Sequence, residues 1–202
     1  MEVWTKFTGD FNAYNILAVY AASCLLGFAK EDILKYISML IPVSGRFETL
    51  LADNGVMAVV DYAHTPDALE NVLSTIRGLV KKGNIVITVV GAGGDRDKTK
   101  RPEMAEAACR YSDRVVLTSD NPRSEVPERI IDDMLVGVRL EDKDRVNAIT
   151  DRREAIGFAI GLAKPGDIVL IAGKGHENYQ EIKGVKYHFD DKEVVHEAFS
   201  RL

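Results

Sequence analysis

The loop Thr118-Ser119-Asp120-Asn121-Pro122-Arg123 carries the residue types with the clearest chemical purpose in this 202-residue chain. It follows the run Arg114-Val115-Val116-Leu117, which predicts a buried strand that ends in a turn. Open α/β sheets bind ligands beyond the carboxyl ends of their strands. An arginine placed there can hold a carboxylate through two parallel hydrogen bonds. We therefore expect this loop to recognise a small anion or an amino acid.

Two further loops also follow predicted strands and carry charged residues. Gly91-Ala92-Gly93-Gly94-Asp95-Arg96 lacks the third glycine of a dinucleotide-binding fingerprint, and no Gly-Lys-Ser/Thr follows to make a P-loop. A plain glycine turn is one interpretation, but Arg96, Lys98 and Lys100 favour a loop that faces an anion. In Gly173-Lys174-Gly175-His176-Glu177, two glycines allow close backbone approach, and the lysine, histidine and glutamate together suit a zwitterion.

The remaining polar residues give weaker indications. In Asp61-Tyr62-Ala63-His64, the carboxylate and the imidazole suit ribose binding, phosphate orientation or proton transfer, with a purely structural cap as an equal alternative. Cys24 and Cys109 lie in apolar helical patterns and are expected to be buried, reduced thiols. The acidic stretch 140–144 is expected to be a solvated loop. The chain contains no Ser-His-Asp order and no metal-spaced set of cysteines and histidines.

A sheet with helices between its strands would gather these loops along one edge. Apolar runs at 56–60, 85–90, 114–117 and 168–172 predict strands, and amphipathic segments at 65–80, 127–138 and 151–163 predict helices. Thr65 with Pro66, and Asp151 with Glu154, are typical of helix starts. The stretch 179–189 predicts a hairpin around Lys183-Gly184, and 192–202 a final helix. This alternation predicts a three-layer, Rossmann-like α/β domain with a mostly parallel sheet and right-handed crossovers.

Composition limits the remaining possibilities. A net charge of −5 argues against general nucleic-acid binding, and no signal peptide or membrane-spanning segment is apparent, so a cytoplasmic protein is expected. Two apolar helices, near 16–27 and 31–40, precede Pro42-Val43-Ser44-Gly45, which we interpret as a linker between residues 1–43 and 44–202. The apolar faces of these helices predict self-association.

Five segments occur in an order that is specific only when they are taken together. They are Gly45-Arg46-Phe47-Glu48, Asp61 to Leu69, Gly93-Gly94-Asp95-Arg96-Asp97-Lys98, Asp120-Asn121-Pro122-Arg123 and Gly173-Lys174-Gly175-His176-Glu177. Over about Ser44 to Leu202, the chain resembles the carboxy-terminal domain of the Mur ligases, and most closely the members that add diaminopimelate to a peptidoglycan precursor. Gly9-Asp10-Phe11-Asn12 with Asn15 resembles the end of that family's central ATPase domain, which makes residues 1–43 a helical remnant of it.

The resemblance implies an ATP-dependent amide ligase that joins meso-diaminopimelate to UDP-MurNAc-L-Ala-D-Glu. In that family, MgATP activates the substrate carboxylate as an acyl phosphate, and attack by the incoming amine gives a tetrahedral intermediate. The P-loop, the modified lysine and most of the Mg²⁺ ligands belong to the central domain. We therefore assign no catalytic or metal-binding residue here and expect this chain alone to be inactive.

The resemblance also implies roles for individual residues. Arg123 holds the distal carboxylate of diaminopimelate with Asn121 beside it, while Arg96, the Gly173 backbone and Glu177 grip the distal amino-acid head. The residues assigned to diaminopimelate are Arg96, Asp120, Asn121, Pro122, Arg123, Gly173 and Glu177. Those assigned to the nucleotide are Asn12, Asn15, Arg46, Asp61 and His64.

Lysine lacks the distal carboxylate and would leave Arg123 desolvated without a partner, so diaminopimelate is expected over lysine. Lanthionine keeps both amino-acid heads and is not easily excluded. Two other interpretations remain open. The chain could be a free-standing, non-catalytic module that binds an amino acid or a cell-wall fragment. It could also be the equivalent domain of a folylpolyglutamate synthase, against which the loop Asp120 to Arg123 speaks.

Overall fold

The computed structural model describes residues 4, 5, 7, 9–41 and 43–202, and the chain forms two compact units, Met1–Val43 and Ser44–Leu202. Pro42, which we assigned to the linker, lies outside the described residues, as do the side chains of Asp10 and Phe11. The identification of the first unit as a remnant of an ATPase domain stays a prediction.

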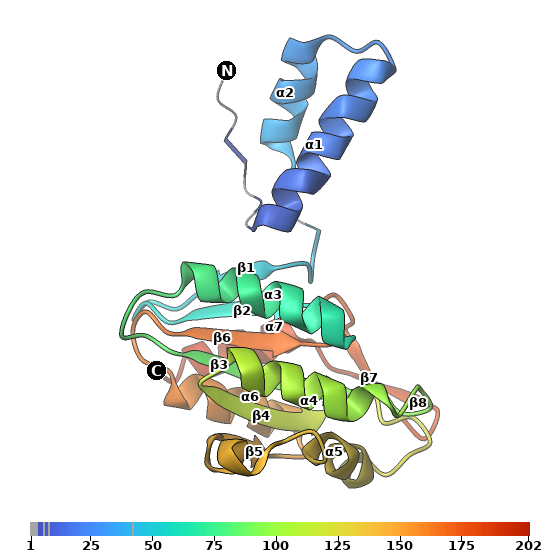
Figure 1. Cartoon of the computed structure of the whole chain (residues 1–202), viewed down its shortest axis with the longest axis vertical. Coiled ribbons are helices and arrows are strands. Elements are labelled where there is room, and N and C mark those ends of the chain that lie inside the picture. Colours follow the sequence, from blue (N-terminus) through green and yellow to red (C-terminus); the bar gives the residue numbers. More distant parts are fainter. Residues whose placement is uncertain (1–3, 6, 8, 42) are drawn as a thin grey trace. The chain divides into compact units, whose positions relative to one another are not determined.

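The first unit is built from two helices, α1 (Asp10–Leu25) and α2 (Lys30–Met39), as predicted (Figure 1). Gly27 adopts a φ of 87°, a left-handed conformation that suits glycine and separates the two helices. Ile33 and Ile37 of α2 are buried. Cys24 is only half-buried, so our prediction of two buried thiols holds for Cys109 alone. Tyr14, Leu17 and Val19 of α1 are exposed.

The second unit contains a six-stranded sheet in the order β1-β2-β6-β3-β4-β5. The strands are β1 (Glu48–Leu51), β2 (Met57–Asp61), β6 (Ile168–Ala172), β3 (Val86–Ala92), β4 (Arg114–Ser119) and β5 (Val146–Ala148). All neighbours pair in parallel except β1, which runs antiparallel to β2. The two outer strands were not predicted from the sequence, because β1 alternates between half-buried and exposed residues and β5 is only three residues long.

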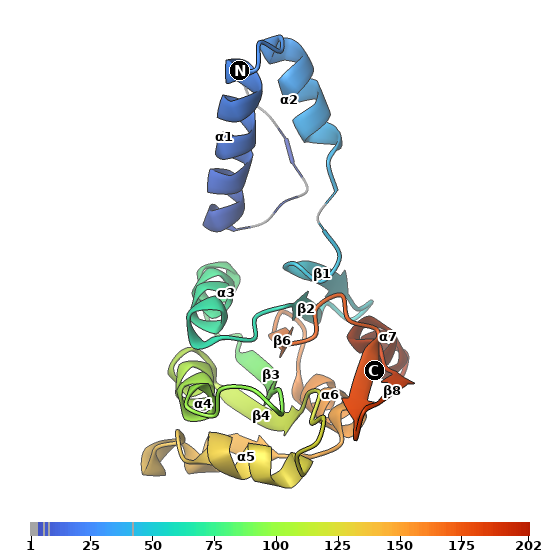
Figure 2. The same ribbon diagram turned by 90° about the vertical axis from the view of Figure 1, so that its right-hand side faces the viewer.

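Helices cover both faces of this sheet, which confirms the three-layer α/β prediction. In Figure 2, α3 (Pro66–Leu79), α4 (Lys100–Tyr111) and α5 (Pro127–Leu135) lie on one face, and α6 (Arg152–Leu162) and α7 (Asp191–Phe199) on the other. Two apolar clusters fill the spaces between the layers. Thr65 accepts a hydrogen bond from the backbone N–H of Ala68, and Asp151 from that of Glu154, as expected of helix caps.

The predicted hairpin is also present, with β7 (Tyr179–Ile182) antiparallel to β8 (Val185–His188). Its turn residues Lys183 and Gly184 have φ values of 50° and 77°, the backbone that a tight two-residue hairpin turn requires. Among the described residues, no helix is long and apolar enough to cross a membrane.

The prediction of a solvated acidic loop at 140–144 is wrong for Asp142, while Leu140, Glu141, Lys143 and Asp144 are exposed as predicted. Residues Leu140–Arg145 form a 3-10 helix, η1, and Asp142 within it is buried. Its carboxylate accepts hydrogen bonds from Arg139 and Arg145, at 3.1 Å and 2.6 Å from their Nε and Nη2 atoms. Two local arginines thus provide the charge that makes burial of an aspartate tolerable.

Candidate functional site

A pocket of about 330 Å³ opens where strands β2, β3, β4 and β6 reach their carboxyl ends. This is the sheet edge at which the sequence placed the polar loops, and parallel strands bring those loops together there. The pocket is lined by Tyr62, His64, Thr65, Ala92, Gly93, Arg96, Asp97, Lys100, Arg101, Met104, Asp120, Asn121, Arg123, Gly173 and Glu177. Six of the seven residues assigned to diaminopimelate line it, Pro122 being the exception.

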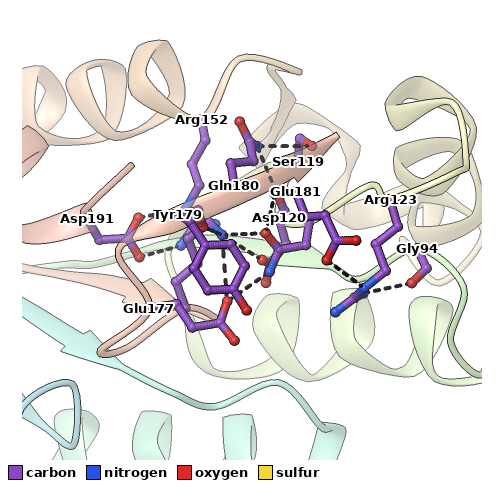
Figure 3. A network of polar contacts seen from close by, with 12 residues as sticks. Gly94, Ser119, Asp120, Arg123, Arg152, Glu177, Tyr179, Gln180, Glu181 and Asp191 are labelled. Carbon is purple, nitrogen blue, oxygen red and sulfur yellow. Dashed lines mark hydrogen bonds and ion pairs between the residues drawn. The ribbon is translucent and has the colours of Figure 1, made fainter. Parts of the chain in front are cut away.

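Arg123 is fixed in place through both its backbone and its side chain. Its φ of 51° is left-handed, and its N–H and C=O pair with Glu181 and Lys183 of the hairpin at 3.0 Å and 2.7 Å. Its Nη1 donates to the carbonyl of Gly94 at 2.8 Å, and its Nε lies 3.6 Å from Glu181 Oε2. The guanidinium is therefore pre-positioned at the pocket (Figure 3), where its side chain remains 21% exposed. Strain at this non-glycine residue is typical of a functional position.

Asn121 and Glu177 form a second fixed pair in the pocket. Asn121 Nδ2 donates to Glu177 Oε2 at 2.8 Å, which links the loop after β4 to the loop after β6. The side chain of Glu177 keeps 18% of its surface exposed. The pocket therefore holds a fixed cation at Arg123 and a fixed anion at Glu177, the charges that an amino-acid head requires.

Lys174 does not have the role that we inferred from its loop. Its side chain is 0% exposed, and its Nζ donates to Asn121 Oδ1 at 2.9 Å and to the carbonyl of Tyr179 at 2.6 Å. Burial lowers the pKa of its ammonium, an effect that the carboxylate of Asp120 opposes. Of the lysine, histidine and glutamate of this loop, only His176 and Glu177 remain for a ligand.

Two glycines let the loops approach one another closely. A Cβ on Gly94 would lie 2.0 Å from the carbonyl oxygen of Pro122, and one on Gly173, whose φ is 117°, would lie 2.6 Å from Asp120 Oδ2. The N–H of Gly94 donates to the carbonyl of Asn121 at 2.9 Å. A side chain at either position would push the loops apart.

The glycine-rich loop and the loop of Arg123 are joined by a further set of charged contacts. Glu125 accepts from the N–H of Asp95 at 2.7 Å and from Arg101 Nη2 at 2.7 Å, while Asp95 accepts from Ser124 Oγ at 2.6 Å. Hydrogen bonds from Arg101 lower the pKa of Glu125 to about 2. Arg96 belongs to the same loop. Its side chain is exposed and lines the pocket, where its charge is available to an anion.

Of the predicted nucleotide-contacting residues of the second unit, His64 lines the same pocket, whereas Arg46 and Asp61 are not among its lining residues. Asp61 is buried, and its two oxygens accept from the N–H groups of Phe47 and Ala63 at 2.7 Å and 2.8 Å. Burial raises the pKa of its carboxyl group. Of the two interpretations left open by the sequence, these contacts support the structural cap, so direct contact between Asp61 and a nucleotide stays a prediction.

His64 and Arg46 are exposed and surround the ring of Tyr62. The His64 ring lies 4.6 Å from the Tyr62 ring, and the Arg46 guanidinium carbon lies 4.9 Å from it. His176 adds a third neighbour at 5.3 Å. An exposed arginine with a planar ring cluster is suited to a phosphate and a base. Asn12 and Asn15 belong to α1 in the first unit.

Sequence reasoning missed several residues that hold the pocket in shape. Gln180 Nε2 donates to the carbonyl of Asp120 at 2.7 Å, and the N–H of Glu181 donates to Asn121 Oδ1 at 2.9 Å (Figure 3). The alternating residues of 179–189 predicted a hairpin, but nothing in the sequence indicated that this hairpin contacts the pocket. Among the described residues, no group of three or more His, Cys, Asp or Glu could hold a metal ion.

The family model described as Mur ligase, glutamate ligase domain matches residues 45–175. The chain belongs to the Mur ligase family. It is 59% identical over 199 residues to the UDP-N-acetylmuramoyl-L-alanyl-D-glutamate–2,6-diaminopimelate ligase of Bacteroides fragilis, which covers 98% of this chain and 41% of that protein. The ligase of the same name from Geobacillus kaustophilus is 52% identical over 196 residues, covering 97% and 40%.

Solved structures agree with this assignment to the Mur ligases. A structure of UDP-N-acetylmuramoyl-L-alanyl-D-glutamate–2,6-diaminopimelate ligase superimposes with a TM-score of 0.76 at 45% identity, covering 98% of this chain and 40% of that one. Folylpolyglutamate synthase of Mycobacterium tuberculosis, solved with ADP and AMPPCP, has a TM-score of 0.65 at 20% identity over 85% and 39%, which shows the fold alone. This Mur ligase chain spans about two fifths of the length of the diaminopimelate ligases it matches.

Proposed function

We propose that this chain is the amino-acid-binding, carboxy-terminal part of an ATP-dependent ligase that joins meso-diaminopimelate to UDP-MurNAc-L-Ala-D-Glu in peptidoglycan synthesis. The observation that carries the proposal is the pairing of Arg123 and Glu177 in one pocket, each held by further contacts. The names of the relatives at 59% and 52% identity support the same activity.

The pocket suits the distal amino-acid head of diaminopimelate. Arg123 donates hydrogen bonds to the distal carboxylate, with the second proton of Asn121 Nδ2 beside it, and Glu177 accepts a hydrogen bond from the distal ammonium. Arg96 and the Gly173 backbone complete the grip on the same head. Because both charged side chains are already held by protein contacts, little conformational entropy is lost when the ligand binds.

The reaction places different demands on the two ends of the diamino acid. Fixing the distal head leaves the other amine free to attack, and this positioning is how binding energy at a remote group accelerates a bond-forming step. ATP supplies the phosphoryl group that activates the carboxylate. In this proposal Arg46 and His64 contact its phosphates or ribose, and Asp61 supports their loop. The adenine contacts assigned to Asn12 and Asn15 stay a prediction about the first unit by itself.

The proposal predicts selectivity among three amino acids. Lysine lacks the distal carboxylate and leaves Arg123 without a ligand partner, so it should bind on the order of 10²-fold more weakly. Arg123 would not be left wholly without a counter-charge, because Glu181 Oε2 lies 3.6 Å from its Nε. The loss of affinity for lysine is therefore smaller than at a site where the arginine has no other partner. Lanthionine keeps both heads and should bind comparably to diaminopimelate.

Binding can be measured directly on the 202-residue chain by calorimetry and by nuclear magnetic resonance (NMR) titration. We expect meso-diaminopimelate to shift resonances of Asn121, Arg123 and Glu177, with lysine far weaker. Tighter binding of lysine would overturn the proposed specificity. The purified chain should not turn over ATP, and measurable turnover would refute that part of the proposal.

A hybrid enzyme tests the full reaction. The matching 199 residues of the Bacteroides fragilis ligase would be replaced by this chain, and phosphate release would be followed with UDP-MurNAc-L-Ala-D-Glu and each amino acid. Release that depends on diaminopimelate supports the ligase. A folded hybrid without release, together with binding by the chain alone, would favour the alternative of a non-catalytic binding module.

A further inference from the structure

Lys174 is a buried ammonium that lies behind the pocket and contacts three of its elements. Besides its bonds to Asn121 and the Tyr179 carbonyl, its Nζ lies 3.3 Å from Asp120 Oδ1 and 3.8 Å from Glu177 Oε2. Figure 3 shows Asp120, Glu177 and Tyr179 converging on one point from the loops after β4 and β6 and from the hairpin. One cation therefore faces two carboxylates.

The orientation of the Asn121 amide follows from its neighbours. The ammonium of Lys174 and the N–H of Glu181 are both donors, at 2.9 Å and 2.9 Å from the same atom of Asn121, so that atom is the oxygen. The amide nitrogen must then face Glu177, to which it donates at 2.8 Å. Lys174 thereby orients the Asn121 amide, and the amide in turn holds one carboxylate oxygen of Glu177 in place.

The charges around Lys174 do not cancel within the protein. The nearby cation Arg152 is already engaged by Asp191, with both side chains 0% exposed. Lys174 is then shared between Asp120 and Glu177, which leaves one negative charge uncompensated. Asp120 Oδ1 is also buried without a hydrogen-bond partner among the described residues, and Asp120 lines the pocket with only 9% of its side chain exposed. Lys174 lies 3.3 Å from this oxygen but is shared with Glu177, so the buried carboxylate is only partly compensated and is stabilised further by a second cation.

We propose that Lys174 is a positioning residue that holds Asp120 and Glu177 side by side and orients Asn121, so that the pocket keeps one negative charge for the ammonium of its ligand. The identity of that ligand, the distal head of a diamino acid, rests on the proposed function. Lys174 itself does not touch the ligand. Without it, the two carboxylates repel each other and Glu177 leaves its place.

The first test needs no ligand. In the wild-type chain, the Asn121 side-chain N–H that Glu177 accepts should exchange slowly with solvent, as observed by NMR. Lys174→Met keeps the length of the side chain and removes its charge, and should speed that exchange at least about tenfold. Lys164→Met, at an exposed lysine of a loop outside the pocket, is the matched control and should leave the exchange unchanged.

The second test compares two ligands that differ only in the distal amine, meso-diaminopimelate and 2-aminopimelate. Lys174→Met should weaken diaminopimelate about 10- to 100-fold, the worth of a charge-assisted hydrogen bond, and change 2-aminopimelate less than about threefold. Lys174→Gln also removes the charge and keeps a polar group facing Asn121, so it is the second variant if Lys174→Met fails to fold. It should show the same selective loss.

Equal losses for both ligands, with unchanged exchange at Asn121, would overturn the proposal and leave Lys174 a purely structural residue. If the wild-type chain binds neither ligand, the proposed function fails. The exchange measurement then still decides whether Lys174 orients Asn121, so the two failures are distinguishable.

Discussion

Arg152 and Asp191 form an ion pair that solvent does not reach. Arg152 Nε and Nη2 lie 2.8 Å and 2.7 Å from the two carboxylate oxygens of Asp191, and both side chains are 0% exposed. The same Nη2 donates to the carbonyl of Ala172 at 3.1 Å, the last residue of β6. The pair therefore ties the start of α6 and the start of α7 to the strand end that carries Gly173 and Lys174.

Breaking this pair should destabilise the fold strongly. Asp191→Asn leaves a buried guanidinium without its counter-charge, and we expect the free energy of unfolding to fall by about 3–5 kcal/mol in urea denaturation. The exposed pair Arg153–Glu197, which joins the same two helices with both side chains 51% exposed, is the matched control. Glu197→Gln should cost less than about 1 kcal/mol. Equal losses for the two variants would contradict this assignment.

The close approach of Gly94 to Pro122 predicts a sharp contrast between two glycines. Gly94→Ala places a Cβ 2.0 Å from a backbone oxygen, so we expect a loss of at least about 2 kcal/mol in thermal unfolding together with weaker diaminopimelate binding. Gly157 of α6 has nothing within 4 Å of the corresponding position. Gly157→Ala should stabilise the protein by about 0.5–1 kcal/mol. Tolerance of alanine at Gly94 would mean that the two loops are not in contact.

The contacts of Glu125 predict a specific acid sensitivity. Its pKa is lowered from the usual 4.5 to about 2 in the folded protein, mainly by hydrogen bonds from Arg101. A lowered pKa adds stability that is fully present above about pH 4.5 and is lost as the pH falls toward 2. With 18% of the Glu125 side chain exposed, we expect this contribution to be about 2 kcal/mol.

The variant Glu125→Gln isolates that contribution from those of other carboxylates. Its unfolding free energy should lie below that of the wild type at pH 7, and the two curves should converge as the pH approaches 2. Urea denaturation at several pH values measures both. Parallel curves over the whole range would show that Glu125 is not the group responsible.

The sequence predicted the parts of the fold that local patterns encode. Runs of valine and isoleucine marked the four central strands, and Thr65 and Asp151 marked helix starts through bonds to residues three positions away. The meeting of the polar loops in one pocket was also predictable, because parallel strands have their carboxyl ends at the same edge of a sheet. The fold class and the family were therefore accessible from the sequence alone.

Residues whose role depends on distant partners were not predictable. Lysine and arginine are almost never fully buried, so Lys174 looked available to a ligand and Arg152 looked like an ordinary helix residue. Their partners Asn121 and Asp191 lie 53 and 39 positions away in the chain. Asp142 differs in that its partners Arg139 and Arg145 are only three positions away, and its burial depends on how these two side chains fold back over a short helix.

Arg123 offers a test of how the pocket recognises a carboxylate. Arg123→Lys keeps the charge but loses the planar fork, so it cannot bond Gly94 and grip a carboxylate in two places at once. We expect diaminopimelate to bind about 10- to 100-fold more weakly by calorimetry, with the unfolding temperature nearly unchanged. Lys183→Arg in the adjacent hairpin turn serves as a control for a charge-conserving exchange of lysine and arginine. Full affinity in Arg123→Lys would show that charge alone suffices.

The first unit exposes large apolar side chains on its two helices and in the turn between them. Leu25, Leu26 and Phe28 are 90%, 77% and 62% exposed, and Tyr36 and Met39 are 64% and 67% exposed. Large contiguous apolar surfaces favour association in water, so we predict that the 202-residue chain self-associates. Light scattering over a range of concentrations should give a mass above 22.3 kDa. Leu25→Lys with Leu26→Lys should shift that mass toward the monomer, whereas Leu79→Lys on the second unit should not. A monomer at all concentrations would contradict the prediction.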